Sequence, residues 1–525
     1  MTTNHTTQSP YFLSTSIPYV NARPHVGHAL EFVLADVYSR YRRQQGRDVF
    51  FLSGSDENSL KNVQAAEALG IPTRELVERY VRAFQELCDM LHVSNDDFIR
   101  TSVDQRHVDG AKRIWQAMVD AGDVYYKSYS GLYCVGCEQF YMEDELVEGR
   151  CPEHGTVPEL VQEENAFFRL SKYGDALHEA ISADTLQVVP RERKNEVLRF
   201  IESGLEDFSI SRSRARARDW GIEVPDDPGQ VMYVWVDALA NYITALDYAT
   251  DGERFQRYWG ESPERVHVIG KGILRFHAIY WPAMLLSAGL PLPTHVVVHG
   301  YLTIGGQKIS KSLGNVIDPA DVVERFGTDP LRYYLLRDFS PFGDGDFTIE
   351  KLAVRYRADL GNDLGNLLNR AVSMIGRYRD GAIPAAGPGT ELEDELTRAL
   401  QQVDARVEAA MQVYDPQAAL VAIWELVTRA NGYVENTAPW TLAKAERGGE
   451  SPQRLDTVLS TLATTLGRIA WLLQPFLPET SARIAAQLGS SGVGYAPHPG
   501  QQVAQPEPIF PRIEDEAAAA SAVSD

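Results

Sequence analysis

Two histidines stand three residues apart near the N-terminus, with a glycine between them. His25 and His28 follow a predicted strand and open a predicted helix, so Gly27 and the first turn bring backbone N–H groups beside both imidazoles. Such a pair can donate hydrogen bonds to the charge that develops on an α-phosphate when a carboxylate attacks it. Considered alone, the same tetrapeptide is explained equally well by packing in the core.

A second cationic motif lies far along the chain. Lys308 and Lys311 flank Ser310, and the pair Gly305 and Gly306 precedes them in a predicted loop. Two lysines on a mobile loop can close over a triphosphate. A solvated loop is the alternative for the lysines alone, but the two motifs together predict a site that handles ATP.

Three cysteines and a histidine have the spacing of a structural zinc site. Cys134, Cys137, Cys151 and His154 form a Cys-x2-Cys-x13-Cys-x2-His arrangement, with two ligand pairs separated by a short loop. Disulfides or free thiols are the alternatives, and disulfides fit poorly with a cytosolic chain. Because the protein would fill all four positions, we expect zinc to stabilise the fold of this segment.

The elements around these motifs alternate between strand and helix. Residues 11–17 and 48–54 have the pattern of buried strands, and residues 26–43 between them have helical spacing. The alternation stops over residues 122–228, which are rich in Tyr, Gly, Glu and Pro, and then resumes. We therefore predict an α/β fold in which a Rossmann-type parallel sheet is split by the zinc-binding insertion. After about residue 350 nearly every pattern is helical, which predicts a separate bundle.

At 525 residues the chain is too long for one hydrophobic core, and shifts in pattern suggest its boundaries. The predicted parts are the first half of the catalytic sheet (1–121), the insertion (122–228), the second half of the sheet (229–300), the lysine loop and its flanking segment (301–350), the helical bundle (351–512) and a flexible tail (513–525).

The composition is that of a globular protein with an acidic surface. No apolar stretch is long enough to span a membrane and the N-terminus does not have the pattern of a signal peptide, so we expect the cytoplasm. The formal net charge of −22 opposes nucleic-acid binding by the surface as a whole. The run of Arg212, Arg214, Arg216 and Arg218 is a local exception, for which phosphate contact and a solvated surface are equally good explanations.

The two phosphate-handling motifs together resemble the signature pair of class I aminoacyl-tRNA synthetases. Within that class, residues 16–21, 233–242, 276–282 and 359–370 are similar to methionyl-tRNA synthetases, and the resemblance extends over nearly the whole chain. It implies that the protein activates methionine with ATP and Mg²⁺ and transfers it to tRNA(Met), including the initiator.

The resemblance also assigns residues to these roles. His25, His28, Lys308 and Lys311 would stabilise the transition state of adenylate formation. The ATP-binding residues would be His25, Gly27, His28, Lys308, Ser310 and Lys311. The methionine-binding residues would be Ile17, Tyr19, Asp56, Trp235, Ala238, Tyr242, Ile273 and His277. Aromatic rings suit a thioether, and Asp56 would hold the ammonium group. Spacing alone equally allows the aromatics to be core residues of a helix.

Two places depart from the family pattern. The family usually has Asp-Glu-His-Gly where this chain has Asp56, Glu57, Asn58 and Ser59, and Gly-Lys-Asp-Ile where Gly272 stands in third place. An imidazole and an acidic side chain near the substrates are therefore absent. Two alternatives stay open: a paralogue that makes an aminoacyl adenylate for an acceptor other than tRNA, and a non-catalytic regulator that binds tRNA.

Three residues of the predicted bundle are candidates for reading RNA bases. Asn366 and Arg370 lie one helical turn apart, and Trp440 begins a later helix after Pro439. A solvated face and ordinary packing are the alternatives for these residues by themselves. The resemblance implies that the three recognise the anticodon in an α-helical anticodon-binding domain. No further RNA-binding domain follows the bundle, so we expect a monomer.

Overall fold

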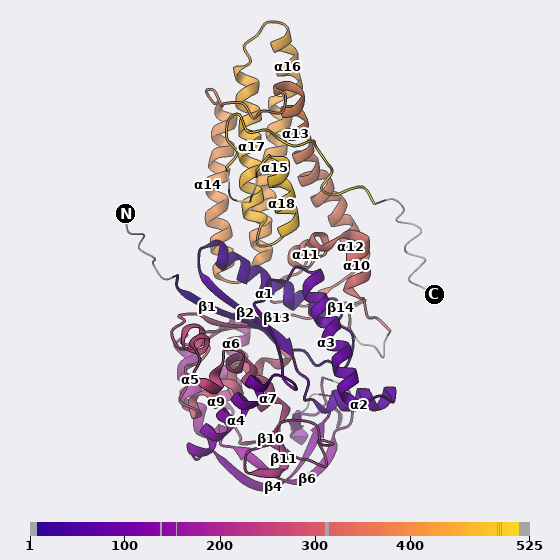
Figure 1. The fold of residues 1–525 in the computed structure, drawn as a ribbon, viewed down its shortest axis with the longest axis vertical. Coiled ribbons are helices and arrows are strands. Elements are labelled where there is room, and N and C mark those ends of the chain that lie inside the picture. The colour runs from indigo at the N-terminus through magenta and orange to yellow at the C-terminus, as the bar shows by residue number, and fades with distance from the viewer. Residues whose placement is uncertain are drawn as a thin grey trace. The chain divides into compact units, whose positions relative to one another are not determined.

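The structure is a computed structural model that describes residues 8–136, 139–153, 155–309, 314–490, 492, 494 and 496–513. They form two compact units, coloured along the chain in Figure 1. The first unit comprises the residues up to 89 and 93–301, and the second comprises 90–92 and the residues from 302 onward. In the part of the chain that is described, no helix has both the length and the apolar character needed to cross a bilayer.

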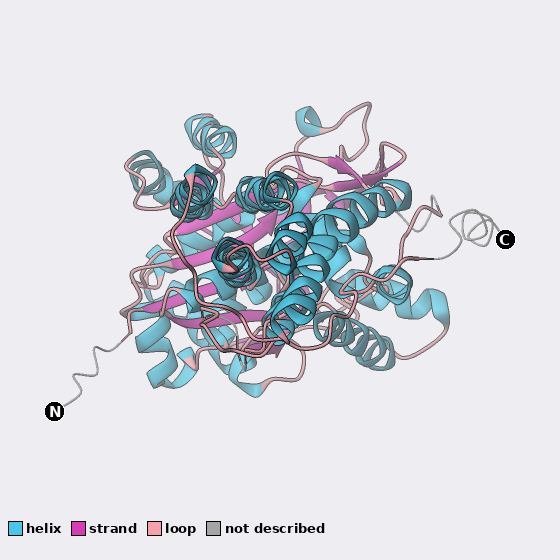
Figure 2. Ribbon diagram, turned by 90° about the horizontal axis from the view of Figure 1, so that it is seen from above, coloured by secondary structure: helices cyan, strands magenta, loops and turns pink. Residues whose placement is uncertain are grey.

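A six-stranded parallel sheet forms the centre of the first unit. The strand order is β3-β2-β1-β12-β13-β7, and the strands are drawn in magenta in Figure 2. The order reverses between β1 and β12, which places a crevice at the carboxyl ends of these two strands. The strands are β1 (Pro10–Thr15), β2 (Asp48–Ser55), β3 (Asp97–Arg100), β7 (Gln187–Val189), β12 (Arg265–Gly270) and β13 (His295–His299). The predicted parallel sheet is confirmed.

Helices cover this sheet and explain why its strands are apolar. Both β1 and β12 are buried at every position after the first, as expected for parallel strands covered on both faces. α1 packs on β1, β2 and β12. The helices of this unit are α1 (Val26–Gln44), α2 (Leu60–Leu69), α3 (Thr73–Met90), α4 (Gln105–Asp120), α5 (Gly174–Ser182), α6 (Arg191–Glu202), α7 (Val234–Thr244), α8 (Glu253–Phe255) and α9 (Trp281–Ser287).

Short helical turns also belong to the first unit. Between β12 and β13 the chain forms a 3-10 turn η5, a π-helical turn η6 and the helix α9. The turns are η1 (Glu143–Glu145), η2 (Leu170–Tyr173), η3 (Tyr248–Thr250), η4 (Gln256–Gly260), η5 (Lys271–Ile273) and η6 (Phe276–Tyr280). A π-helical turn rotates the side chains that follow it, and such turns are frequent at functional sites.

The inserted segment forms two small antiparallel sheets. One has the order β5-β4-β6-β8 and the other β10-β11-β9. Their strands are β4 (Val124–Cys134), β5 (Gln139–Tyr141), β6 (Glu159–Phe168), β8 (Phe208–Ser209), β9 (Ser211–Ser213), β10 (Glu223–Val224) and β11 (Asp227–Met232). Between β6 and β8 the chain returns to the main sheet, where β7 pairs in parallel with β13. The segment predicted as an insertion thus also supplies an edge strand of the catalytic sheet, which its composition did not reveal.

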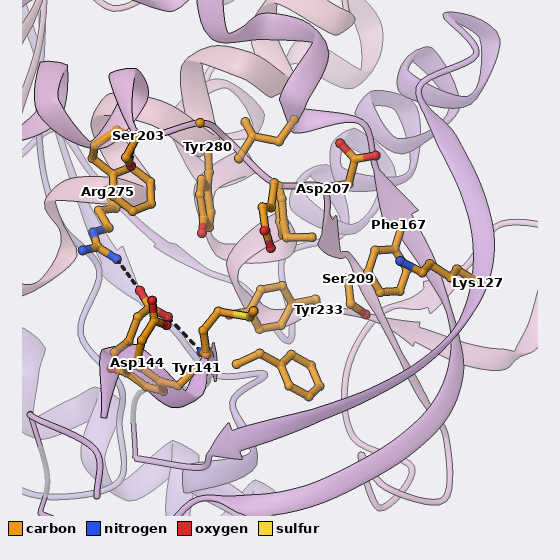
Figure 3. A pocket seen from close by; sticks show the side chains of 18 of the residues that line it. Lys127, Tyr141, Asp144, Phe167, Ser203, Asp207, Ser209, Tyr233, Arg275 and Tyr280 are labelled. Atoms are coloured by element: carbon orange, nitrogen blue, oxygen red, sulfur yellow. Dashed lines mark hydrogen bonds and ion pairs between the residues drawn. The ribbon is translucent and has the colours of Figure 1, made fainter. Parts of the chain in front are cut away.

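A cavity of about 440 Å³ lies where the insertion meets the turn η6 (Figure 3). Its walls come from β4, β5, β6 and β8, from the end of α6 and from the residues on either side of η6. All of these elements belong to the first unit.

The second unit begins with a three-stranded sheet and continues as a helical bundle. The sheet has the order β15-β14-β16, with β14 (Leu302–Ile304), β15 (Gln307–Lys308) and β16 (Gly345–Asp346). The helices are α10 (Pro319–Phe326), α11 (Thr328–Arg337), α12 (Ile349–Arg355), the π-helical η8 (Tyr356–Gly365), α13 (Asn366–Arg379), α14 (Glu391–Gln412), α15 (Pro416–Thr437), α16 (Pro439–Arg447), α17 (Gln453–Leu473) and α18 (Pro478–Gln487). The predicted helical bundle is confirmed, and α15 and α17 pack together within it.

Candidate active site

His25 and His28 cap the first helix in a reciprocal arrangement. His25 is the N-cap of α1, and its Nδ1 accepts a hydrogen bond from the backbone N–H of Gly27 at 3.1 Å. Nδ1 of His28 in turn accepts from the backbone N–H of His25 at 3.1 Å. When Nδ1 of a neutral imidazole accepts, Nε2 carries the proton. The helix cap therefore leaves both rings with Nε2 as the N–H donor.

The electrostatics of this pair favour neutral donors. The two ring centroids lie 4.0 Å apart, and His28 also packs edge-on against Phe84 at 5.0 Å. Burial, and then the neighbouring His25, hold the pKa of His28 well below its ordinary value. His28 is therefore uncharged at neutral pH. It can donate to a phosphate at the positive end of α1 without repelling its partner ring.

An aromatic cluster lines the crevice beside β1. Trp235 on α7 stacks on Phe276 with ring centroids 3.7 Å apart and planes only 6° apart. Tyr19 and His277 both approach Trp235 edge-on, each at 6.4 Å. The structure thus brings together three residues predicted for the amino acid, and Phe276, which stacks on Trp235, was not among those predicted.

Hydrogen bonds fix the protonation of His277 and Tyr242. Nδ1 of His277 donates to the carbonyl of Ile273 at 2.9 Å, so its Nε2 accepts from the hydroxyl of Tyr242 at 2.6 Å. Burial lowers the pKa of His277 to about 4, and burial raises that of Tyr242. Both groups are neutral at pH 7. Ala238 lies between Trp235 and Tyr242 on α7 and is buried.

Asp56 occupies the end of the neighbouring strand. It follows β2 directly, forms a parallel bridge with Tyr19 and is 3% exposed. Its backbone N–H donates to the carbonyl of Pro18 at 2.9 Å, which holds the ends of β1 and β2 together. Ile17 reaches the same place, because its Cγ2 lies 3.0 Å from where a Cβ on Gly54 would stand. The carboxylate therefore lies in the crevice beside the aromatic cluster.

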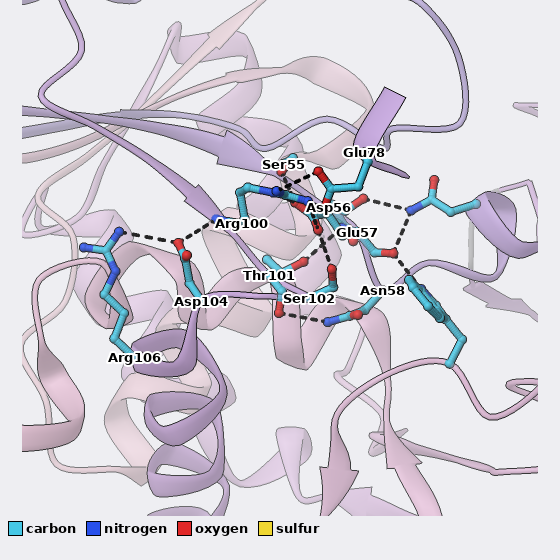
Figure 4. Close-up of polar contacts among 12 residues, drawn as sticks. Ser55, Asp56, Glu57, Asn58, Glu78, Arg100, Thr101, Ser102, Asp104 and Arg106 are labelled. Carbon is cyan, nitrogen blue, oxygen red and sulfur yellow. Dashed lines mark hydrogen bonds and ion pairs between the residues drawn. The ribbon is translucent and has the colours of Figure 1, made fainter. Parts of the chain in front are cut away.

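The first departure from the family pattern, Asn58, is hydrogen-bonded to the helix that carries Trp235. The amide of Asn58 donates to Asp237 at 2.7 Å. It also donates to the carbonyl of Thr101 at 3.2 Å, and this second bond is drawn in Figure 4. The other carboxylate oxygen of Asp237 contacts Nε2 of the fully buried His107 at 2.6 Å. Asp237 belongs to α7, which carries Trp235 and Tyr242. Asn58 therefore positions the helix that forms the pocket.

At the second departure from the family pattern, Gly272, the side chain of Tyr301 occupies the space beside the glycine. A Cβ placed on Gly272 would stand 1.9 Å from the hydroxyl oxygen of Tyr301 and 3.3 Å from its Cζ. The same ring lies 4.9 Å from Nζ of Lys271 and touches the position of a Cβ on Gly270. The phenol thus occupies the space that a side chain at position 272 would need.

Lys308 lies in the second unit on an exposed hairpin. Gly305 and Gly306 have φ values of 61° and 72°, as a tight two-residue hairpin between β14 and β15 requires. The N–H of Gly306 donates to Asp346 at 2.8 Å, and this bond holds the pKa of that carboxylate below its ordinary value. Ser310 and Lys311 lie outside the described residues.

Two of the four predicted zinc ligands are described. Cys134 ends β4 and Cys151 follows on the neighbouring loop, and each thiol is 1% exposed in one small cluster with Tyr141 and Leu146. Both are free thiols. Cys137 and His154 lie outside the described residues, and within the described ones no group of three or more ligands forms. Two buried thiols in one cluster fit the donor set of a structural zinc site.

Arg370 and Trp440 meet on the helical bundle. The guanidinium of Arg370 lies 5.6 Å from the centroid of the Trp440 ring and pairs with Glu435 at 2.7 Å. Trp440 remains 44% exposed, and Asn366 is exposed one turn before Arg370 on α13. Glu435 was not predicted, because it lies on α15 and meets Arg370 only in the folded bundle.

Comparisons with known proteins agree with this geometry. A family model described as tRNA synthetases class I (M) matches residues 11–157 and 153–372, and one described as the anticodon binding domain of methionyl tRNA ligase matches 383–523. The split parallel sheet, the histidine-capped α1 and these matches define a class I aminoacyl-tRNA synthetase. The chain belongs to the methionyl-tRNA synthetase family.

Relatives and solved structures give the same family. The methionine–tRNA ligase of Brucella suis is 44% identical and is matched over 96% of this chain and 98% of its own. That of Caldanaerobacter subterraneus is 44% identical over 97% of this chain and 80% of its own. The Mycobacterium tuberculosis methionyl-tRNA synthetase in complex with methionyl-adenylate is 40% identical with a TM-score of 0.92, covering 96% of this chain and all of that one. The predicted family is confirmed.

Proposed function

We propose that this protein is a methionine–tRNA ligase that works in two steps. The carboxylate of methionine first attacks the α-phosphorus of ATP, which forms methionyl adenylate and releases pyrophosphate. The terminal ribose hydroxyl of tRNA(Met) then attacks the carbonyl carbon, which forms methionyl-tRNA and releases AMP. The observation that carries the proposal is the neutral aromatic cluster of Tyr19, Trp235, Phe276 and His277. Tyr19 lies on the segment that joins β1 to the histidine-capped α1.

The pocket suits a thioether side chain. Trp235, Tyr19 and Phe276 present polarizable rings, with which sulfur makes favourable contacts. The one polar pair at its base, Tyr242 and His277, is neutral and already hydrogen-bonded internally. A charged amino-acid side chain would be desolvated there without a partner, at a cost above the roughly 2–7 kcal/mol of an unpaired neutral polar group. The buried Asp56 would hold the ammonium group at the other end of the substrate.

At the phosphate end of the substrate, hydrogen-bond donors would act rather than a covalent nucleophile. Nε2–H of His25 and of His28 would stabilise the charge on the α-phosphate, aided by the N-terminus of α1. Lys308 and Lys311 would hold the triphosphate, with Gly27 and Ser310 completing the ATP site. Mg²⁺ bound with ATP supplies neutralisation of the phosphate charges.

Zinc would be a structural cofactor held by Cys134, Cys137, Cys151 and His154. The burial of the two described thiols in one cluster supports this assignment. Metal analysis should find one zinc per chain, and Cys151→Ser should release it. Release of zinc should disorder the hairpin β4–β5, as measured by increased hydrogen exchange there, before it affects the main sheet. Full zinc content in that variant would contradict the ligand assignment.

The bundle would recognise the anticodon of tRNA(Met), initiator and elongator alike. Trp440 offers an exposed ring for stacking a base, and Asn366 and Arg370 offer hydrogen-bond donors on the adjacent helix. Trp440→Ala should weaken charging of tRNA(Met) while leaving methionine activation unchanged. The enzyme would act as a monomer in the cytoplasm, where its tRNA substrate is used.

The decisive experiment is ATP–pyrophosphate exchange with each of the twenty amino acids, followed by charging of tRNA(Met). We expect exchange with methionine above all others and formation of methionyl-tRNA. Exchange with methionine but no charging of any tRNA would instead favour a paralogue with another acceptor. Binding of tRNA without any exchange would indicate a regulator.

A further inference from the structure

The side chains that line the cavity between the insertion and η6 have no role in the amino-acid activation proposed above. Aromatic rings dominate its walls, and the rings of Phe208 and Tyr280 stack on each other at 4.4 Å and 16°. Lys127 and Arg275 lie on opposite sides of it (Figure 3). Flat rings combined with separated cations are the means by which proteins bind unpaired nucleotides.

A buried arginine forms one wall of this cavity. Arg212 is 6% exposed, and its guanidinium lies 4.2 Å from the ring of Tyr233 and 5.0 Å from that of Phe140. Nη1 donates to the hydroxyl of Ser209 at 2.9 Å and to the carbonyl of Ser211 at 2.7 Å. Among the described residues no carboxylate pairs with Arg212, and its Nε has no hydrogen-bond partner.

This arrangement is costly unless an anion joins it. A buried guanidinium without a carboxylate partner is destabilising, and an unused donor adds to the cost. Cation–π contacts offset part of this cost, but they leave Nε of Arg212 without a hydrogen-bond partner. A phosphate group is the ligand that the geometry of an arginine fits best.

The acidic residues of the cavity do not exclude such a ligand. Arg275 pairs with Glu145 at 3.2 Å, and Asp207 accepts from the hydroxyls of Ser171 at 2.7 Å and Tyr125 at 2.9 Å. The other two carboxylates, of Asp144 and Glu206, are exposed at the rim. Rim carboxylates can accept hydrogen bonds from the exocyclic amino group of a base.

From these observations we propose that the cavity binds a single unpaired nucleotide unit, with its base against the aromatic walls and its phosphate toward Arg212 and Lys127. Two sources share this chemistry: the 3′-terminal adenosine of tRNA and free AMP. The first source rests on the proposed function, because it requires tRNA as a substrate. The volume of about 440 Å³ lies in the range of small-ligand sites.

The cavity is next to the methionine pocket and shares a wall with it. Phe276 and His277 of η6 contact Trp235 and Tyr242, whereas Arg275 and Tyr280, on either side of them, line the cavity. Phe276 and Tyr280 also meet edge-on at 5.2 Å. A nucleotide bound here is therefore close to the adenylate site but separate from it.

Binding can be tested with two probes, 5′-AMP and the trinucleotide CpCpA. The holoenzyme is first saturated with a non-hydrolysable sulfamoyl analogue of methionyl adenylate, so that 5′-AMP cannot enter the adenylate site. Lys127→Glu reverses an exposed charge, and Arg212→Lys keeps the buried cation but removes the fork. The matched control is Lys112→Glu, at an exposed position of α4.

We expect at least one probe to bind the saturated wild-type enzyme. Lys127→Glu and Arg212→Lys should weaken that binding about tenfold or more, while Lys112→Glu should leave it unchanged. If CpCpA binds and both variants also lose about tenfold in kcat/KM for tRNA with normal methionine-dependent exchange, the source is tRNA. If AMP binds and charging is unaffected, the source is the free nucleotide.

Two results would overturn the proposal. One is that neither probe binds the saturated wild-type enzyme, and the other is that Lys127→Glu binds the probes as tightly as Lys112→Glu does. Failure of the proposed function is separate, since it would appear as an absence of methionine-dependent exchange in the wild-type enzyme before any probe is added.

Discussion

At the scale of single residues, two departures from the family pattern are compensated by neighbours. Asn58 binds Asp237 on the helix of the aromatic pocket, and Tyr301 fills the space beside Gly272. Neither partner could be predicted from the sequence, because each lies far along the chain and meets its partner only across the crevice. The predicted residues of the amino-acid pocket do come together, whereas Phe276 was missed for the same reason.

The contact between Gly272 and Tyr301 gives a paired prediction. Gly272→Ala places a methyl group 1.9 Å from the phenol oxygen and should displace the ring, lowering kcat/KM in pyrophosphate exchange about tenfold. Tyr301→Phe in the same chain removes that oxygen and leaves the nearest ring carbon at 3.3 Å, so the double variant should recover most of the loss. Gly376→Ala, with open space around it, is the control. A double variant no better than Gly272→Ala would contradict the steric explanation.

His277 makes stability depend on pH. Its pKa is about 4 in the folded protein against an ordinary 6.5, so between these values the unfolded chain binds a proton that the folded chain does not. Stability should therefore rise as the pH increases from 4 to 6.5, by about 3 kcal/mol from this residue. The urea midpoint of His277→Gln should change less between pH 4.5 and 7 than that of the wild type. His178→Gln, at an exposed site, should retain the full dependence.

At the scale of elements, the predicted strands 11–17 and 48–54 and the predicted helix 26–43 are found as β1, β2 and α1, to within a few residues. The exceptions have physical reasons. β7 is only three residues long and gains its stability from pairing with β13, which local composition cannot reveal. Residues 276–280 have helical periodicity, but the extra residue per turn of a π-helix is decided by tertiary packing.

His25, at the start of α1, caps the helix and also offers an Nε2–H donor to phosphate, and a substitution can separate these two roles. Asparagine is a good N-cap, so His25→Asn should preserve the helix while removing the Nε2–H donor. Adenylate formation should fall about a hundredfold or more, with the melting temperature nearly unchanged. His25→Ala should lose both, with a further destabilisation of about 1 kcal/mol. Near-normal exchange in His25→Asn would exclude the histidine as a phosphate donor.

At the scale of the whole molecule, a net charge of −22 confines RNA contacts to a few sites. The charging rate should then be more sensitive to salt than amino-acid activation is. Between 50 and 200 mM salt we expect kcat/KM for tRNA to fall about tenfold, a modest loss that reflects few phosphate contacts. Methionine-dependent exchange over the same range is the internal control. A fall of a thousandfold or more would indicate a much larger basic footprint.

The edge strand β7 limits which deletions or replacements of the inserted segment the catalytic sheet can tolerate. Because residues 187–189 pair with β13, the inserted segment cannot be treated as a removable cassette. Deleting residues 122–228 would strip the outermost strand from the catalytic sheet and leave the edge of β13 open to pairing with other chains. Shortened or transplanted versions of the insertion must therefore keep β7 in place.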